Sequence, residues 1–406
     1  MTDATVSNDI GREQHISQLA SDYSAKPKML QQEQDLGIFK PIIGSWYESL
    51  KNPPESQWQA LNDLVEGYKR TIYGKNHDAS GVKETADFRA RFPIIDCKGL
   101  NPYLTEVQKG NDTAILPEPL VCWVMTRGST GAAKVLPATN THLEQIFTCG
   151  ARALVNHVLR KNSFELLTGH ILNLNFPSNV HTTVRDGRAI TYGYSSGTYA
   201  RLNPMLDRVS LLPRQEDLDA LGSGITKADW EKRFELAYQQ TVDANVTATM
   251  GVTPVILAFA RYVSKKYGRK PKELWNVKAL FCTSVRKIQF KYAPILRKLF
   301  GQIPIVEIYS ATEGVFAQQL DDLPYVTPNY DKYFFEVETK HGMKMLHELK
   351  RGEWGKLIVS SCMFPRYDIG DLVEAAGNNY FRVIGRNKAS TLLEHKLYRL
   401  LYGWLI

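Results

Sequence analysis

The chain has 406 residues, of which 43% are hydrophobic and 23% charged, as in ordinary globular proteins. Its net charge of +8 comes from Lys and Arg scattered among Asp and Glu, without a basic run that could follow a phosphate backbone, so we expect no nucleic-acid partner. No apolar stretch approaches the roughly 20 residues that a membrane span needs, so we expect no membrane partner.

The cysteines indicate the compartment. There are five, without a C-x-x-C pair, which leaves no metal knuckle, and the odd number argues against a disulfide framework. The N-terminus, "MTDATVSNDIGREQ", is polar and does not resemble a signal peptide. We therefore expect reduced thiols and a cytoplasmic location.

Helices are predicted first along the chain. Residues 1–90 are expected to form a helical segment packed on a main domain, because "PPESQWQALNDLVEGYKRTIYGK" repeats its apolar residues at helical spacing. Further on, "NTHLEQIFTCGARALVNHVL" predicts a long helix that begins with a capping box of Thr141 and Glu144.

From about residue 119, short apolar strands alternate with helices. The strand candidates are "LVCWVM", "HILNLNF", "VKALFCT", "IPIVEIY", "KLIVSSC" and "YFRVI". The segment "TTVRDGRAITYG" predicts a hairpin that turns at Asp186 and Gly187. This alternation predicts an α/β fold with sheets covered by helices.

A loop rich in Gly, Ser and Thr follows the first predicted strand: "TRGSTGAAKVLPAT", residues 126–139. Such a loop can bind phosphate, because glycine lets backbone N–H groups approach an anion while hydroxyls and a lysine add donors and charge. It matches neither G-x-x-x-x-G-K-[ST] nor G-x-G-x-x-G; for the first motif, Val135 follows the lysine where Ser or Thr is required. Taken alone, the segment fits a plain turn equally well.

Three later segments offer groups suited to the rest of a nucleotide. In "VEIYSATEG", Tyr309 has a flat face for a purine, Thr312 a donor for phosphate, and Glu313 a hard ligand for Mg²⁺. In "FPRYDIGDLV", Asp371 follows a glycine in an expected tight turn and can accept both hydroxyls of a ribose. In "YFRVIGRNKAS", Arg386 follows a strand and can serve the ribose-phosphate. Each segment alone also fits an ordinary turn or surface position.

Together, the order and spacing of these segments resemble the adenylate-forming superfamily of acyl-CoA synthetases, adenylation domains and luciferases. The chain is most similar to the plant auxin-responsive acyl-acid amido synthetases and their microbial relatives, over about residues 88–397. "TRGSTGAAKVLP" resembles their phosphate loop, "EIYSATEG" their adenine and metal motif, and "FPRYDIGD" their "YRYRxGD" ribose motif. The resemblance implies the large N-terminal domain of these enzymes, with helix-covered mixed sheets and a smaller β subdomain.

The resemblance also implies roles for the residues of the phosphate loop. Ser129, Thr130 and Lys134 would contact the β- and γ-phosphates of ATP, and Gly128 and Gly131 would allow close approach.

The later motifs would hold the rest of the nucleotide. Tyr309 would lie against adenine, Thr312 would touch the α-phosphate, and Glu313 would bind Mg²⁺. Asp371 would hold the ribose, and Arg386 would sit at a hinge. The implied reaction is attack of a carboxylate on the α-phosphate of ATP, catalysed with Thr312, Glu313 and Lys134, followed by conjugation to an amine such as an amino acid. The histidines His157 and His170 are expected to be structural.

The same resemblance divides the chain into a helical segment (1–90), an adenylate-forming domain (91–385), and a hinge with the start of a C-terminal lobe (386–406). The lobe's entry segment is followed by no lobe, so we expect a fragment, a shortened gene product, or half of a split enzyme with its lobe on a separate chain. Two alternatives to amide conjugation stay open: an acyl-CoA synthetase, and a non-catalytic nucleotide- or acyl-binding remnant.

Overall fold

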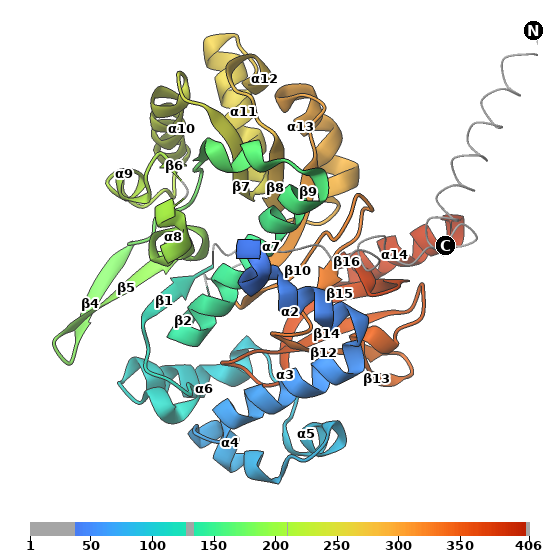
Figure 1. The fold of residues 1–406 in the computed structure, drawn as a ribbon. Coiled ribbons are helices and arrows are strands. Elements are labelled where there is room, and N and C mark those ends of the chain that lie inside the picture. Colours follow the sequence, from blue (N-terminus) through green and yellow to red (C-terminus); the bar gives the residue numbers. More distant parts are fainter. Residues whose placement is uncertain (1–36, 127–133, 209, 403–406) are drawn as a thin grey trace, which may run out of the picture.

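The computed structural model describes residues 37–126, 134–208 and 210–402. Within these residues the strands form three sheets of seven, five and four strands, with helices packed on them (Figure 1). The α/β fold predicted from the alternation of strands and helices is confirmed.

The seven-stranded sheet lies in the middle of the chain, and five of its strands are parallel. Its order is β11-β10-β9-β8-β7-β3-β6, in which β6, β3, β7, β8 and β9 run parallel and β10 and β11 are antiparallel. The bounds are β3 (His170–Leu172), β6 (Leu211–Leu212), β7 (Val246–Val252), β8 (Ala279–Thr283), β9 (Ile305–Ala311), β10 (Gly314–Gln318) and β11 (Thr327–Pro328).

This sheet is apolar on both faces. In β8 the side chains alternate between two core clusters: Ala279 and Phe281 join one, Leu280 and Cys282 the other. Helix α7 (Asn140–Lys161) contributes to the first cluster, and α10 (Lys227–Thr241), α11 (Thr253–Tyr267) and α13 (Ala293–Phe300) contribute to the second. A strand buried on both faces reads as a continuous apolar run, as "ALFCT" does.

Helix α7 begins earlier than the sequence predicted. Its N-cap is Thr139, whose side-chain oxygen accepts a hydrogen bond from the backbone N–H of His142 at 3.3 Å. The predicted capping box of Thr141 and Glu144 is therefore wrong, because both residues lie inside the helix. The backbone N–H of Thr141 instead donates to a carboxylate oxygen of Glu118 at 3.1 Å.

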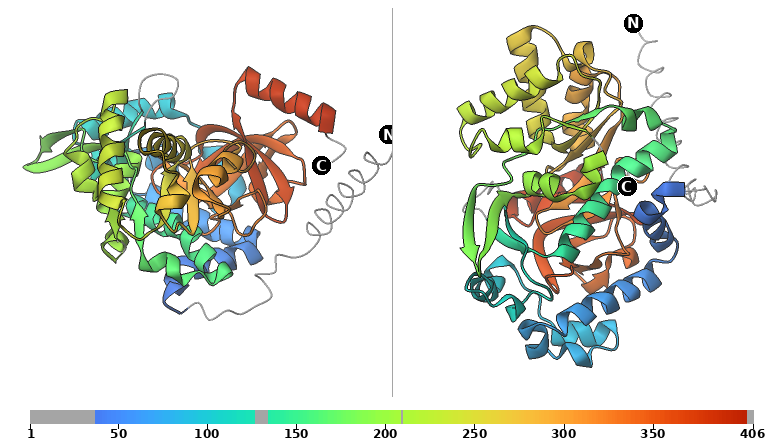
Figure 2. Two further views of the ribbon diagram at one scale, coloured as in Figure 1. Left: turned by 90° about the horizontal axis from the view of Figure 1, so that it is seen from above. Right: turned by 60° about the vertical axis from the view of Figure 1, so that its left-hand side comes forward.

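The four-stranded sheet has the order β2-β1-β5-β4 and carries the predicted hairpin. Its strands are β1 (Cys122–Met125), β2 (Val135–Ala138), β4 (His181–Arg185) and β5 (Arg188–Tyr194). Asp186 and Gly187 have φ of 50° and 75°, the left-handed values that a two-residue hairpin turn requires. The hairpin projects from the body of the molecule in both figures (Figures 1 and 2).

The five-stranded sheet near the C-terminus is antiparallel, with the order β13-β12-β14-β15-β16. Its strands are β12 (Phe334–Thr339), β13 (Gly342–Met345), β14 (Trp354–Ser360), β15 (Tyr367–Gly377) and β16 (Tyr380–Arg386). The pairing of β15 with β14 is offset by a bulge, because Lys356 lies opposite Leu372 whereas Ile358 lies opposite Asp368.

The N-terminal helices are blue to cyan in Figure 1, and among them α3 packs on β12 of this sheet. They are α2 (Lys40–Lys51), α3 (Pro53–Tyr68), α4 (Ile72–Asn76), α5 (Thr85–Arg91) and α6 (Cys97–Gln108). The indole of Trp46 donates to the carbonyl of Pro328 at 2.9 Å, and one buried cluster extends from Ile43 to Phe381. The two ends of the described chain therefore share a core, while the domain boundaries at 90 and 385 remain predictions.

The remaining helices are short or terminal. They are α8 (Ser195–Leu202), α9 (Gln215–Asp219), α12 (Pro271–Leu274) and α14 (Ala389–Tyr402). On α14, Leu393, Leu397 and Leu400 are exposed, and His395 packs against Trp354 with ring centroids 5.1 Å apart. Over residues 37–402, apart from the two short gaps, no helix combines the length and apolarity needed to cross a bilayer.

Candidate functional site

Three of the site's residues come from three different sheets. Lys134 precedes β2 of the four-stranded sheet, Glu313 lies in the turn between β9 and β10 of the seven-stranded sheet, and Tyr367 begins β15 of the five-stranded sheet. The tyrosine hydroxyl contacts both of the other side chains. Sequence reasoning predicted Lys134 and Glu313 but missed Tyr367, although it stands inside the quoted segment "FPRYDIGD".

The carboxylate of Glu313 is buried, and two groups face it. The hydroxyl of Tyr367 donates to its Oε1 at 3.0 Å, and the ammonium of Lys134 lies 3.6 Å from the same oxygen. Lys134 Nζ also donates to the Tyr367 oxygen at 3.1 Å. Because an ammonium can only donate, the tyrosine proton is left for the carboxylate. Burial and the charge of Glu313 raise the pKa of Tyr367, which keeps this donor protonated.

A second buried carboxylate, Asp371, is held from two sides. The hydroxyl of Tyr309 donates to its Oδ2 at 2.8 Å, and Arg386 Nε lies 3.2 Å from its Oδ1. Asp371 and Arg386 face each other in the β15–β16 ladder. Burial raises the pKa of Asp371, and Arg386 and Tyr309 oppose that rise. The two carboxylates are close enough for the charge of Glu313 to raise the pKa of Asp371 further.

The predicted tight turn before Asp371 is wrong, because the segment lies inside β15. Gly370 has a φ of 81°, and a side chain there would be strained. A glycine in this conformation, in the stretch where the pairing with β14 is offset, lets the strand re-aim its side chains while it stays in the sheet. The signal that sequence reasoning read as a turn is therefore a bulge signal.

The ring of Tyr309 is nearly covered. It packs against Phe316 and Phe381 with ring centroids 5.6 and 6.0 Å away, and 9% of the residue is exposed. Any contact with a purine would use its remaining edge, and this role stays a prediction.

Thr312 is held through its backbone. Its carbonyl accepts a hydrogen bond from the hydroxyl of Tyr199 at 2.7 Å, and His142 Nε2 lies 3.2 Å from the same hydroxyl oxygen. Since the tyrosine proton goes to the carbonyl, Nε2 of His142 must be the protonated nitrogen. Burial lowers the pKa of His142 to about 4, which keeps the ring neutral near pH 7. Sequence reasoning did not predict these contacts, because neither residue belongs to a nucleotide motif.

The segment before α6 supports Tyr367. The backbone N–H of Ile95 donates to the carbonyl of Arg366 at 3.1 Å, and Asp368 returns a bond to Ile95 at 2.8 Å. This pairing brings Cys97, at the start of α6, beside Lys134 and Tyr367. Burial is the main cause that raises the pKa of this thiol.

The predicted phosphate loop is described only at its base. The backbone N–H of Thr126 donates to the carbonyl of Lys134 at 2.8 Å, and the N–H of Lys134 donates to the hydroxyl of Thr126 at 2.9 Å. Gly128, Ser129, Thr130 and Gly131 lie outside the described residues. Lys134, at the end of the loop, lies beside Glu313 and Tyr367.

The donor set fits a magnesium ion shared with phosphates. Within the described residues, no three His, Cys, Asp or Glu side chains gather as a complete metal site. Magnesium usually takes one or two carboxylates, with phosphate oxygens and waters as its other ligands. The single carboxylate of Glu313, with Lys134 beside it for phosphate charge, matches that pattern.

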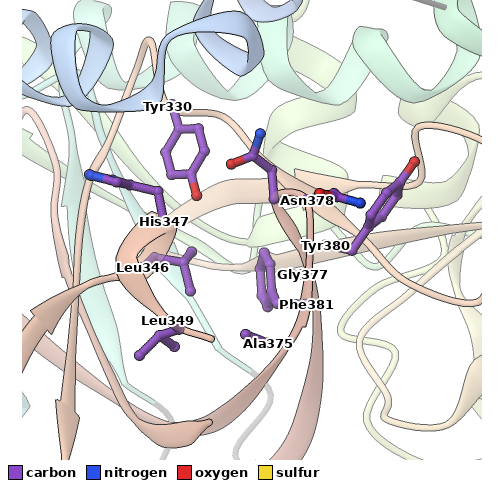
Figure 3. A pocket seen from close by; sticks show the side chains of 10 residues that line it. Tyr330, Leu346, His347, Leu349, Ala375, Gly377, Asn378, Tyr380 and Phe381 are labelled. Carbon is purple, nitrogen blue, oxygen red and sulfur yellow. The ribbon is translucent and has the colours of Figure 1, made fainter. Parts of the chain in front are cut away.

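A small cavity elsewhere takes no part in this site. It opens between the β15–β16 turn and the end of β13, and the side chain of Tyr330 points into it (Figure 3). Tyr330 is fully buried, and no hydrogen-bond partner for its hydroxyl lies among the described residues. Likewise, none of the predicted site residues lines the cavity. The predicted structural histidines also lie elsewhere: His157 packs edge-on against Phe281, and His170 bonds Ser210 at 2.6 Å.

Comparison with known proteins shows which families and solved structures this chain resembles. Residues 43–220 match the family model "GH3 family N-terminal domain". The structure is similar to a GH3.15 acyl acid amido synthetase solved with 2,4-DB, with a TM-score of 0.72 and 16% identity over 88% of this chain and 72% of that one. The chain therefore has the fold of these enzymes and resembles the GH3 N-terminal domain over residues 43–220.

Two further proteins are similar to this chain. A 2-hydroxyisobutyryl-CoA ligase solved with 2-HIB-AMP and CoA has a TM-score of 0.59 and 13% identity, over 88% of this chain and 74% of that one. The indole-3-acetic acid-amido synthetase GH3.2 of Arabidopsis thaliana is 25% identical over 100 residues. That alignment spans 24% of this chain and only 18% of the curated relative.

Proposed function

We propose that this chain activates a carboxylic acid with ATP, as an acyl-adenylate. The observation that carries the proposal is the pair of buried carboxylates, Glu313 and Asp371, each held beside a cation on an adenylate-forming fold. One carboxylate suits the magnesium of a nucleotide, and the other suits its ribose. Lys134, at the end of the Gly/Ser/Thr loop, lies close enough to influence the charge of both carboxylates.

In this proposal the chain holds the reactants and supplies charge. Asp371 accepts the ribose hydroxyls, with Arg386 beside it, and Tyr309 borders the adenine. Ser129, Thr130 and Lys134 hold the β- and γ-phosphates, with Gly128 and Gly131 allowing close approach, and Thr312 lies at the α-phosphate. Glu313 would hold Mg²⁺, which supplies positive charge to the crowded phosphates when bound.

The chemical step needs no side-chain nucleophile. An oxygen of the substrate carboxylate attacks the α-phosphorus, the P–O bond to the β-phosphate breaks, and pyrophosphate leaves with the electron pair. No proton is transferred, so positioning and electrostatic stabilisation are the protein's contribution.

For the second step we propose amide formation with an amine such as an amino acid. The match to the GH3 N-terminal domain favours it, because the similar proteins are named amido synthetases. The likeness to a CoA ligase keeps thioester formation as the second candidate. The thiols are all free, which suits a reducing compartment, and we propose the cytoplasm.

Exchange of labelled pyrophosphate into ATP tests the activation step directly. We expect exchange that depends on a carboxylic acid, in a screen of aryl, indolyl and fatty acids. Product analysis with amino acids and with coenzyme A then separates amide from thioester formation. ATP binding without exchange under any acid would instead favour the non-catalytic remnant.

Glu313→Gln tests most directly whether this carboxylate holds the cation. The amide keeps an oxygen for the Tyr367 hydroxyl but loses the charge that a cation needs, so we expect exchange to fall about 100-fold or more. Glu338→Gln, a partly exposed carboxylate on β12, is the matched control and should leave exchange unchanged. Equal exchange in both variants would contradict the assignment of Glu313.

A further inference from the structure

One hydroxyl stands between the two charged groups of the proposed magnesium site. Tyr367 is 2% exposed, donates to Glu313 at 3.0 Å and accepts from Lys134 at 3.1 Å. The hydroxyl of Tyr367 therefore contacts the ammonium of Lys134 and the carboxylate of Glu313 at the same time.

The geometry is that of an interrupted ion pair. Lys134 Nζ and Glu313 Oε1 are 3.6 Å apart, longer than the roughly 2.8 Å of a direct charge-assisted hydrogen bond. Lys134 is partly exposed and on a flexible stem, so it could close this gap if nothing stood in the way. A direct pair would direct the ammonium protons at the carboxylate and occupy an oxygen that a cation needs.

We propose that Tyr367 is a positioning residue that keeps Glu313 and Lys134 apart, so that the carboxylate serves a divalent cation and the ammonium serves phosphate. This inference rests on the proposed function and adds to it a residue that would touch neither metal nor nucleotide. The hydroxyl acts by giving each charged group a neutral partner, so neither charge is neutralised before the ligand binds.

Tyr367→Phe tests the proposal, because it removes the hydroxyl and leaves the ring. The measurement is ATP binding by titration calorimetry at a series of Mg²⁺ concentrations, without acid substrate. We expect the Mg²⁺ concentration for half-maximal binding to rise about tenfold or more, as expected when a hydrogen bond to a charged group is lost. The matched control is Tyr330→Phe, which removes a fully buried hydroxyl that has no partner among the described residues, and it should keep the wild-type midpoint.

A double variant separates positioning from mere packing. If Lys134 closes onto Glu313 in Tyr367→Phe, then removing the ammonium in Tyr367→Phe/Lys134→Met should return the Mg²⁺ midpoint to that of Lys134→Met alone. Purely additive effects would overturn the proposal, since a packing defect does not depend on the lysine.

A crystal structure of the unaltered chain with Mg²⁺ and ATP tests the same point without a variant. We expect the Tyr367 hydroxyl still to donate to Glu313 while Lys134 contacts phosphate; a hydroxyl that touches neither side chain would overturn the proposal. If the wild-type chain binds no ATP at all, the proposed function fails. If it binds Mg²⁺ and ATP but the two Tyr→Phe variants behave alike, only the inference about Tyr367 fails.

Discussion

At the scale of single residues, the site contains two buried carboxylates, and each of them has polar partners. Glu313 and Asp371 each accept a hydrogen bond from a tyrosine hydroxyl and lie beside a cation. Burying an ionised carboxylate is costly unless it is paired and hydrogen-bonded, so these partners keep both groups usable inside the protein.

Replacing Asp371 tests the ribose assignment. In Asp371→Ala the arginine Arg386 loses its carboxylate partner and Tyr309 loses its acceptor, so we expect the ATP concentration for half-maximal exchange to rise about tenfold or more. The rate at saturating ATP should change less, because the ribose is remote from the bond that breaks. The control is Glu338→Ala on β12, and an unchanged ATP requirement in Asp371→Ala would contradict the assignment.

Two residues outside every predicted motif help to position Thr312 of the site. Tyr199 and His142 fix the carbonyl of Thr312 through a chain of two hydrogen bonds. Neither signal is visible in the sequence, because the three residues come from separate elements and meet only in the folded chain.

At the scale of elements, α7 carries two buried histidines with the same electrostatic tendency. Burial lowers the pKa of His142 and of His157 to about 4, from an ordinary value of 6.5. Between these values the unfolded chain binds protons that the folded chain does not. The free energy of unfolding should therefore fall as the pH drops from about 6.5 towards 4.

Urea denaturation of wild type and His142→Gln/His157→Gln across this pH range measures that contribution. The double variant should lose less stability per unit of pH, although it is less stable overall at pH 7. The comparison between the two proteins matters, because burial raises the pKa of Glu307 to about 7 and that carboxyl contributes with the opposite sign. Equal slopes would show that the imidazoles are protonated in the folded chain.

Strand β15 was not among the strands predicted from the sequence, although its neighbours β14 and β16 were, as "KLIVSSC" and "YFRVI". The glycine before Asp371 was read as part of a turn. Both a turn and a bulge need the left-handed backbone of Gly370. The choice between them depends on whether β14 and β16 continue alongside, which is information from distant parts of the chain.

At the scale of the whole molecule, the two ends of the described chain stabilise each other. Gln57 on α3 is 1% exposed, donates to the carbonyls of Tyr330 and Tyr333 at 2.9 and 2.7 Å, and accepts from the backbone N–H of Phe335 at 2.7 Å. These bonds join the N-terminal helices to the C-terminal sheet that carries Asp371.

Gln57→Ala should therefore destabilise the molecule as a whole. Three buried backbone groups would lose their partners, so we expect the free energy of unfolding to fall by about 2–4 kcal/mol, without a separate transition for the N-terminal helices. Urea denaturation followed by tryptophan fluorescence and by circular dichroism measures this. Gln59→Ala, on the exposed side of α3, is the matched control. Two separate transitions would contradict the shared core.

The sequence by itself determined the elements that depend on local residue patterns. The apolar runs became strands, the long periodic segment became α7, and Asp186-Gly187 became the hairpin turn, because each depends on local geometry and on the alternation of buried faces. The candidate nucleotide motifs were also visible in the sequence as short segments that combine carboxylate, hydroxyl and lysine groups, although each segment alone also fits an ordinary turn.

Only the tertiary structure decided which of these groups meet. Lys134 reaches Tyr367 across 233 residues, Glu313 reaches it across 54, and Tyr309 reaches Asp371 across 62. Three sheets must pack before one hydroxyl can touch a carboxylate and an ammonium together. A hydrogen bond requires that its atoms approach within about 3 Å, and spacing along the chain carries no information about such an approach.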